Sequence, residues 1–126
     1  MPLHIVHVED DEPLQDLLKI ALHASDSSIK LKQFMMGEEA LAYILEAGST
    51  VDLFVLDIQL PGSLSGLELA HKIREMNLRG AIVLCSAYAS PKQETVAAVS
   101  GEYIPKPWRI LDVTRHLLSY GSNSVL

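Results

Sequence analysis

Short apolar runs alternate with amphipathic segments along the whole chain. Five of these runs have the length and composition of strands: Ile5–Val8, Ile29–Phe34, Leu53–Leu56, Ala81–Cys85 and Glu102–Ile104. Two of them, Leu53–Leu56 and Ala81–Cys85, are apolar throughout, as strands covered on both faces should be. Strands that alternate with helices in this way predict a parallel sheet with right-handed crossovers. The expected fold is therefore α/β, a doubly wound five-stranded parallel sheet in a (βα)5 arrangement.

The segments between the runs repeat apolar residues at the three- and four-residue spacing of amphipathic helices. The first stripe consists of Leu14, Leu17, Leu18 and Ala21, and three further stripes lie within residues 41–45, 67–73 and 110–117. A fourth helix is expected at about Pro91–Val99, although its apolar residues are few. Its predicted start is a capping box formed by Ser90 and Gln93. Ser65 and Glu68 have the same spacing before the third helix.

Composition and charge exclude several classes of function. A length of 126 residues fits one domain, so we expect a single domain over residues 1–126, with a frayed tail at 121–126 and no effector domain. The net charge is −6 and the basic residues form no cluster, which argues against a direct nucleic-acid interface. The five histidines lack metal-ligand spacing, which argues against zinc.

The chain carries no signal for a membrane or an oxidising compartment. Its longest apolar stretch, Ala81–Cys85, is far shorter than the ~20 residues of a membrane span, and its N-terminus lacks the basic and apolar regions of a secretion signal. The lone Cys85 is expected to be a small buried hydrophobe in a reducing compartment. We therefore expect a cytoplasmic protein.

Charged and polar residues stand where the predicted strands end. The first strand runs into Glu9 and Asp10, the third into Asp57, the fourth into Ser86 and the fifth into Lys106. Ligands of open α/β sheets bind outside the carboxyl ends of the strands. Clustered carboxylates repel each other unless a cation is present, and hard oxygen ligands suit Mg²⁺. A metal, an ammonium and a hydroxyl are what a phosphoryl group requires, with the Asp57 carboxylate as the nucleophile.

Four segments at these strand ends resemble the response-regulator receiver domain, in the family's order and near its usual separations: Val8–Asp11, Leu56–Pro61, Ser86–Ala87 and Tyr103–Pro107. The resemblance covers essentially the whole chain and implies a flavodoxin-like fold. It also implies a switch that accepts a phosphoryl group from a sensor histidine kinase or a histidine phosphotransfer protein and then changes partner binding. Such a domain is not an enzyme beyond self-phosphotransfer and autodephosphorylation.

The resemblance assigns a role to each residue of the phosphorylation and metal site. Asp57 corresponds to the phosphoacceptor. Asp10, Asp57 and the backbone carbonyl of Gln59 correspond to ligands of Mg²⁺, with Glu9 acting through water. Gln59 and Tyr88 occupy the two variable positions that tune dephosphorylation in the family.

A second set corresponds to the switch. Ser86 is the hydroxyl that contacts the phosphoryl group, and Ala87 is the small residue beside it. Lys106 pairs with a phosphoryl oxygen, and its bond to Pro107 is cis in the family. Tyr103 is the switch aromatic. We expect the Ser86 hydroxyl to lack a strong partner, and its loop to lie away from the acceptor, before phosphorylation.

Some residues depart from the pattern or have a plainer reading. Gly66 lies nine residues after the acceptor, where the family usually has eight, so the preceding loop is one residue longer. His7 stands where the family usually has an aliphatic residue, and it is expected to be a buried histidine with its polar atoms satisfied. Asp11 is expected in the first turn of a helix rather than on a metal.

Three alternatives remain open. A degenerate receiver that only binds partners would usually lack Asp57 or Lys106, and both are present. An aspartyl-phosphate phosphatase of the haloacid dehalogenase type has a second aspartate two residues after the nucleophile, where this chain has Gln59. A flavodoxin-like flavin binder would place a phosphate at the first strand-to-helix turn, where the acidic segment Glu9–Glu12 would repel it.

Overall fold

The computed structural model describes residues 2–88 and 90–122. In this part of the chain five parallel strands form one sheet in the order β2-β1-β3-β4-β5. The strands are β1 (His4–Val8), β2 (Lys30–Phe34), β3 (Leu53–Asp57), β4 (Ala81–Ser86) and β5 (Gly101–Pro105). The helices are α1 (Glu12–Ser25), α2 (Gly37–Ala47), the 3₁₀ turn η1 (Gly48–Thr50), α3 (Gly66–Glu75), α4 (Gln93–Ala97) and α5 (Ile110–Ser122). The predicted doubly wound (βα)5 fold is confirmed.

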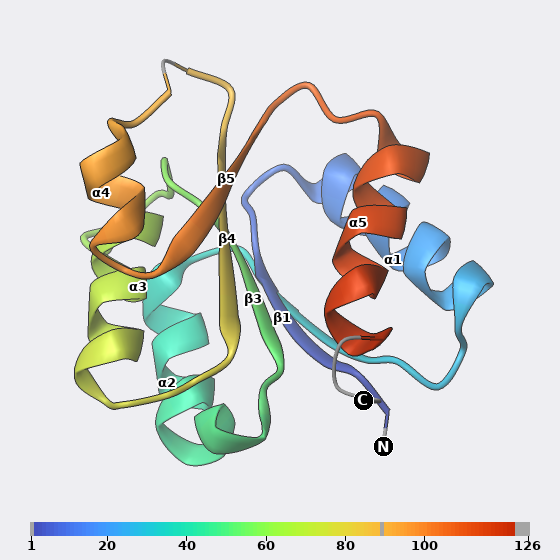
Figure 1. Ribbon diagram of the computed structural model, residues 1–126, viewed down its shortest axis with the longest axis horizontal. Helices are drawn as coiled ribbons and strands as arrows, with labels where there is room; N and C mark the ends of the chain where they lie inside the picture. Colours follow the sequence, from blue (N-terminus) through green and yellow to red (C-terminus); the bar gives the residue numbers. More distant parts are fainter. Residues whose placement is uncertain (1, 89, 123–126) are drawn as a thin grey trace.

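Helices cover both faces of the sheet, with α1 and α5 on one face and α2, α3 and α4 on the other (Figure 1). Every residue of β1 and β3 is buried. This explains why the residues of these strands are all apolar except for His4, His7 and Asp57. The core beneath α1 and α5 includes Ile5, Leu18, Leu22, Val55 and Leu117. The core on the other face includes Val6, Phe54, Leu56, Ala70 and Ile73. The central strands therefore hold their carboxyl ends in a fixed register.

The buried face of α1 differs from the predicted stripe. Leu18 is fully buried as expected, but Leu17 is 46% exposed. The buried residues of the helix are Gln15, Leu18 and Leu22, so the buried face includes two residues, one of them polar, that were not in the predicted stripe. The prediction was wrong by about one helical position because it counted only apolar side chains.

Two of the helix starts follow their capping signals and one does not. The capping box of Ser65 and Glu68 is present at the start of α3. Asp11 is the N-cap of α1 and accepts a hydrogen bond from the amide of Leu14, so it lies one residue before the first turn in which it was expected. The predicted box at Ser90 is wrong, because α4 begins at Gln93 and its N-cap is Lys92. Lysine has no side-chain acceptor, so this short helix starts without a side-chain cap.

The C-terminal helix extends further than the sequence indicated. α5 continues through Gly121 and Ser122, two residues assigned to the frayed tail, and residues 123–126 lie outside the described part of the chain. None of the helices in that part has the length and apolar character needed to cross a bilayer.

A polar cluster surrounds His4 at the amino end of β1. The acidic residues lie at the other end of the strands. The His4 ring contacts the Tyr43 hydroxyl at 2.9 Å and Thr50 Oγ1 at 3.1 Å, and the His4 amide donates to Asp52 Oδ2. Lys30 and Lys32 are the cations near the ring. Burial lowers the pKa of His4, and the charge of Lys30 adds to this effect. His4 is therefore held in its neutral form.

This environment makes stability depend on pH. The unfolded chain binds a proton at His4 near its ordinary pKa of about 6.5, whereas the folded chain binds it only at lower pH. The contribution of His4 is therefore complete above that pH and is lost as the pH falls through it. We expect His4→Gln to reduce the loss of unfolding free energy between pH 7.5 and pH 5.5, measured by urea denaturation. His71→Gln, on the exposed face of α3, should leave the wild-type dependence unchanged, and equal slopes in all three proteins would contradict this account.

Candidate functional site

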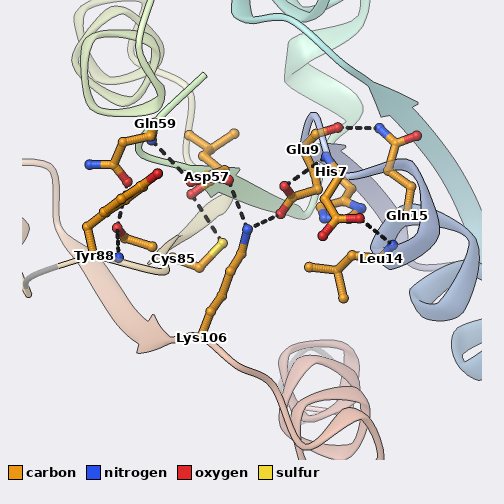
Figure 2. A network of polar contacts seen from close by, with 12 residues as sticks. His7, Glu9, Leu14, Gln15, Asp57, Gln59, Cys85, Tyr88 and Lys106 are labelled. Atoms are coloured by element: carbon orange, nitrogen blue, oxygen red, sulfur yellow. Dashed lines mark hydrogen bonds and ion pairs between the residues drawn. The ribbon is translucent and has the colours of Figure 1, made fainter. Parts of the chain in front are cut away.

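The acidic strand ends and the last lysine meet at the carboxyl edge of the sheet (Figure 2). β1 ends immediately before Glu9, β3 ends at Asp57, and Lys106 follows β5. A cavity of about 390 Å³ opens over them. It is lined by Glu9, Asp10, Asp11, Asp57, Gln59, Leu60, Pro61, Ala87, Tyr88 and Lys106. The fold therefore gathers residues that are up to 97 positions apart in the chain.

Three of the four carboxylates that line this cavity lie close together. Oxygen atoms of Glu9, Asp10 and Asp57 all lie within 4.8 Å of one another. Glu9 and Asp57 are buried, whereas Asp10 is exposed to solvent. Two backbone amides hold the buried pair in place, because the amide of Asp11 donates to Glu9 Oε2 and the amide of Gln59 donates to Asp57 Oδ1, each at 3.1 Å. One oxygen of each buried carboxylate is thus held by the backbone, which fixes the positions of Glu9 and Asp57.

Lys106 lies between the two buried carboxylates (Figure 2). Its Nζ is 2.5 Å from Glu9 Oε1 and 2.9 Å from Asp57 Oδ2. Burial by itself would lower the pKa of Lys106, but the hydrogen bonds to Asp57 and Glu9 outweigh burial and raise it above its ordinary value. Lys106 is therefore a cation, and the peptide bond that joins it to Pro107 is cis.

The charges in the cavity do not balance. Burial raises the pKa of Glu9 to about 7, and the negative charge of Asp57 adds to this while the hydrogen bond from Lys106 opposes it. When Glu9, Asp10 and Asp57 are all ionised, the single ammonium of Lys106 leaves two of these three negative charges unpaired. A cluster of oxygen donors with a surplus of about two charges suits a hard divalent cation.

Ser86, the last residue of β4, is buried and its hydroxyl is already engaged. It donates to Gln59 Oε1 at 2.5 Å and accepts from the amide of Tyr88 at 3.0 Å. The prediction that this hydroxyl lacks a strong partner was wrong. The reason is tertiary, because the loop after β3 places the Gln59 side chain beside the end of β4. The neighbouring Ala87 and Tyr88 are exposed and line the cavity.

Tyr103 lies on β5, next to this loop. Its side chain is half-buried against the core beneath α3 and α4. The phenol donates to the backbone carbonyl of Ser86 at 3.3 Å, so the aromatic residue and the hydroxyl residue of the predicted switch are in direct contact. Cys85 is buried as expected; burial raises the pKa of its thiol.

His7 is buried, but only one of its ring nitrogens has a partner. Gln33 Nε2 lies 3.1 Å from His7 Nδ1, and His7 Nε2 has none, so the expectation of a satisfied histidine is wrong for that atom. The ring stacks on Trp108 with centroids 6.1 Å apart. Burial lowers the pKa of His7 to about 3, and the charge of Lys106 contributes. His7 is therefore neutral.

Gln15 and Gln33 were not recognised as relevant to the site from the sequence. Gln15 donates from its side-chain amide to the backbone carbonyl of Glu9, and Gln33 donates to the backbone carbonyl of Gln15. The available signal was a polar residue at a helical position that faces the sheet. Such a residue is buried only when it finds hydrogen-bond partners.

Comparison with known proteins shows which family this chain resembles. Residues 5–117 match the family described as the response regulator receiver domain. The transcriptional regulatory protein TrcR of Mycobacterium tuberculosis is 29% identical over 118 residues, which cover 92% of this chain and 44% of TrcR. The uncharacterized transcriptional regulatory protein YkoG of Bacillus subtilis is 32% identical over 109 residues, which cover 85% of this chain and 46% of YkoG. The chain thus spans about half the length of these curated relatives.

A solved structure has the same fold. The CheY-like response regulator receiver domain protein of Methanospirillum hungatei superposes with a TM-score of 0.85 at 22% identity, covering 98% of this chain and 96% of its own. The family match spans most of the chain, and the site lies within it. The chain therefore belongs to the response regulator receiver domain family, the phosphoacceptor switches of two-component systems.

Proposed function

We propose that Asp57 accepts a phosphoryl group from the phosphohistidine of a sensor histidine kinase or histidine phosphotransfer protein, in a Mg²⁺-dependent reaction that switches partner binding. The observation that carries this proposal is the contact of Lys106 Nζ with Asp57 Oδ2 at 2.9 Å, within a cavity that also holds Glu9 and Asp10. An ammonium that contacts a buried carboxylate provides both a nucleophile and a counter-charge for an incoming phosphoryl group.

The residues present fit a magnesium ion. Asp10 and Asp57 would bind it directly, the backbone carbonyl of Gln59 would be a third ligand, and Glu9 would act through water. All of these are the hard oxygen donors that Mg²⁺ prefers. When bound, the ion would supply positive charge to the oxygens of the transferred group.

The transfer itself would be carried out by this chain's own residues. An Asp57 carboxylate oxygen forms a bond to phosphorus while the bond from phosphorus to the donor's imidazole nitrogen breaks, and the electron pair returns to the imidazole. Lys106 then donates to a phosphoryl oxygen in place of the free carboxylate. The product is an acyl phosphate, and attack by water on it returns Asp57 and inorganic phosphate. Only self-phosphotransfer and autodephosphorylation are proposed as chemistry.

The change in partner binding after phosphorylation would depend on an exchange of hydrogen-bond partners at Ser86. Before phosphorylation its hydroxyl donates to Gln59 Oε1 and its carbonyl accepts from Tyr103. A phosphoryl oxygen on Asp57 offers a charge-assisted bond, roughly twice as strong as the neutral bond it replaces. Ser86 would therefore move toward Asp57, and the Tyr103 contact to its carbonyl would have to adjust. A ligand shifts such an equilibrium only by its differential affinity for the two states.

This coupling predicts the behaviour of one variant. Beryllofluoride, which mimics the phosphoryl group, should shift the amide NMR signals near Asp57 and also those near Tyr103. We expect Ser86→Ala to keep the shifts near Asp57 and to lose those near Tyr103. Ser119→Ala, on the exposed face of α5, is the control and should show the wild-type pattern. If Ser86→Ala retains the full set of shifts, the coupling runs through another residue, with Lys106 the first to test.

Incubation with acetyl phosphate or phosphoramidate and Mg²⁺ tests the proposed function directly. Mass spectrometry should show one phosphoryl group per chain, removed by mild base as an acyl phosphate is, and chelation of the metal should prevent its formation. A wild-type protein that binds Mg²⁺ but forms no adduct would favour the degenerate receiver. The remaining proposals are that residues 1–126 form one receiver domain, that its setting is the cytoplasm, and that its output acts through a partner or through further sequence.

A further inference from the structure

Gln15 is a buried polar residue on the inner face of α1, a face that otherwise carries leucines. It is 9% exposed. Its side-chain amide donates two hydrogen bonds to backbone carbonyls on two different strand ends, to Glu9 at 2.8 Å and to Phe34 at 2.9 Å. Figure 2 shows Gln15 beside Glu9, on the side away from Lys106. The proposed chemistry makes no use of this residue.

The bond from Gln15 holds one particular peptide group. The carbonyl of Glu9 belongs to the peptide that joins Glu9 to Asp10, the two acidic residues of the loop. On the other side of Glu9, its amide donates to the carbonyl of Phe34 at 2.9 Å. Phe34 therefore accepts from both Glu9 and Gln15. Both peptide groups that flank Glu9 are thus fixed to the end of β2 or to α1.

The far end of the acidic loop is fixed by the same helix. Asp11 caps α1 through its side chain, and its carbonyl accepts from the amide of Gln15 at 3.0 Å. Gln15 therefore contacts the loop from its backbone and from its side chain. In this way a single residue connects the first turn of α1 to Glu9 and Asp11, with Asp10 held between them.

We propose that Gln15 is a positioning residue for the acidic pair, setting the placement of Asp10 and Glu9 for the divalent cation. This inference rests on the proposed function. If the loop that carries Glu9 and Asp10 were free to move, both residues would have to be ordered when the ion binds, and that ordering reduces affinity. A loop fixed in advance by hydrogen bonds binds without this cost, because supporting contacts around a metal site hold its ligands in position.

The variant that tests this is Gln15→Met, which keeps the length and volume of the side chain and removes both donors. Binding of Mg²⁺ followed by amide NMR shifts should weaken about tenfold, at the low end of what loss of a supporting hydrogen bond costs a metal site. Phosphorylation by acetyl phosphate should need correspondingly more Mg²⁺ for half-maximal rate but reach the wild-type rate at saturation. If Gln15 served only to stabilise the fold, its loss would not raise the Mg²⁺ concentration needed for half-maximal rate while leaving the saturated rate unchanged.

Gln33→Met is the matched control. Gln33 is an equally long, partly buried amide in the same hydrogen-bond network, and it donates to the carbonyl of Gln15 but not to the acidic loop. It should keep wild-type Mg²⁺ affinity. Asp10→Ala marks the loss of a direct ligand and should bind much more weakly than either. A folded Gln15→Met protein with wild-type Mg²⁺ affinity would overturn the inference.

A measurement on the wild-type protein covers the case in which Gln15→Met does not fold. The side-chain amide signals of Gln15 should be protected from hydrogen exchange and should shift when Mg²⁺ is added, because the carbonyl they contact is joined to Asp10. Unprotected signals, or signals that do not respond while the amides of the acidic loop do, would also overturn it. A wild-type protein that binds no Mg²⁺ would instead contradict the proposed function.

Discussion

Replacing Asp57 with asparagine should abolish the phosphoryl adduct, from one group per chain to none. The side chain is held by the amide of Gln59 and by Lys106, and an asparagine oxygen can accept at least one of these bonds, so the fold should persist. An amide has no carboxylate oxygen to attack phosphorus, and it cannot form an acyl phosphate. The check is intact-mass measurement after incubation with acetyl phosphate and Mg²⁺.

The control is Asp16→Asn, which makes the same chemical change on the exposed surface of α1. It should be phosphorylated at the wild-type rate. Circular dichroism of both variants establishes that they are folded. Modification of Asp57→Asn at the wild-type rate would show that another carboxylate is the acceptor, with Glu9 and Asp10 the first candidates.

Gly66→Ala should be among the most destabilising single substitutions in this chain. Gly66 is the first residue of α3, and a Cβ built on it would lie 1.9 Å from the backbone oxygen of Asp57 and 3.1 Å from the Cα of Ile58. These are backbone atoms, so relief requires the helix or the end of β3 to move. We expect the free energy of unfolding to fall by more than about 3 kcal/mol, measured by urea denaturation.

The same substitution at Gly121 is the matched control. There a Cβ would lie 3.5 Å from the side chain of Leu3, an ordinary contact, and alanine is favoured over glycine in a helix. Gly121→Ala should therefore be neutral or slightly stabilising. Equal stability of Gly66→Ala and the wild type would mean that the loop before α3 accommodates the methyl group. In that case the position of Asp57 does not depend on the absence of a side chain at residue 66.

Gly66 lies against the acceptor strand, although the loop before it is predicted to be one residue longer than in the family. It lies nine residues after Asp57, one more than the family usually has, yet its amide donates to the carbonyl of Ile58 at 3.0 Å. The contact that brings the helix against the acceptor strand is therefore present. Within the loop, the segment Pro61–Ser63 is exposed, and the amide of Ser63 donates to Glu38 Oε2.

Local pattern was sufficient for the strands, the helix order and the residues at the strand ends. Asp57 could be located because a β-strand that is buried on both faces is nearly continuous in apolar residues, and its first charged residue marks its end. Lys106 follows β5, an edge strand that is only half-buried, and it was located as the residue after the fifth predicted strand, within the segment Tyr103–Pro107. The capping box at Ser65 was equally readable, because its two partners are three residues apart. Each of these signals depends only on neighbours in the sequence.

The predictions that were wrong concern side chains whose partners are distant in the sequence. Ser86 was expected to be unpartnered, but its partner Gln59 comes from the loop after β3, 27 residues away. His7 was expected to be satisfied, and one nitrogen is not, because Gln33 reaches only the other. No periodicity reports such pairs, since they depend on which loops and strands meet and on the rotamers available there.

The amino-acid sequence by itself thus determined the (βα)5 fold and the identity of the acidic, hydroxyl and ammonium groups at the sheet edge, because both follow from local hydrophobic pattern and from the rule that ligands bind where parallel strands end. Only the tertiary structure decided that Gln15 is buried against the acidic loop. The register of β1 on β2 places Val8 opposite Phe34, so two backbone carbonyls lie within reach of one amide on α1. A buried polar side chain is stable only with such partners, and their positions exist only once the sheet has formed.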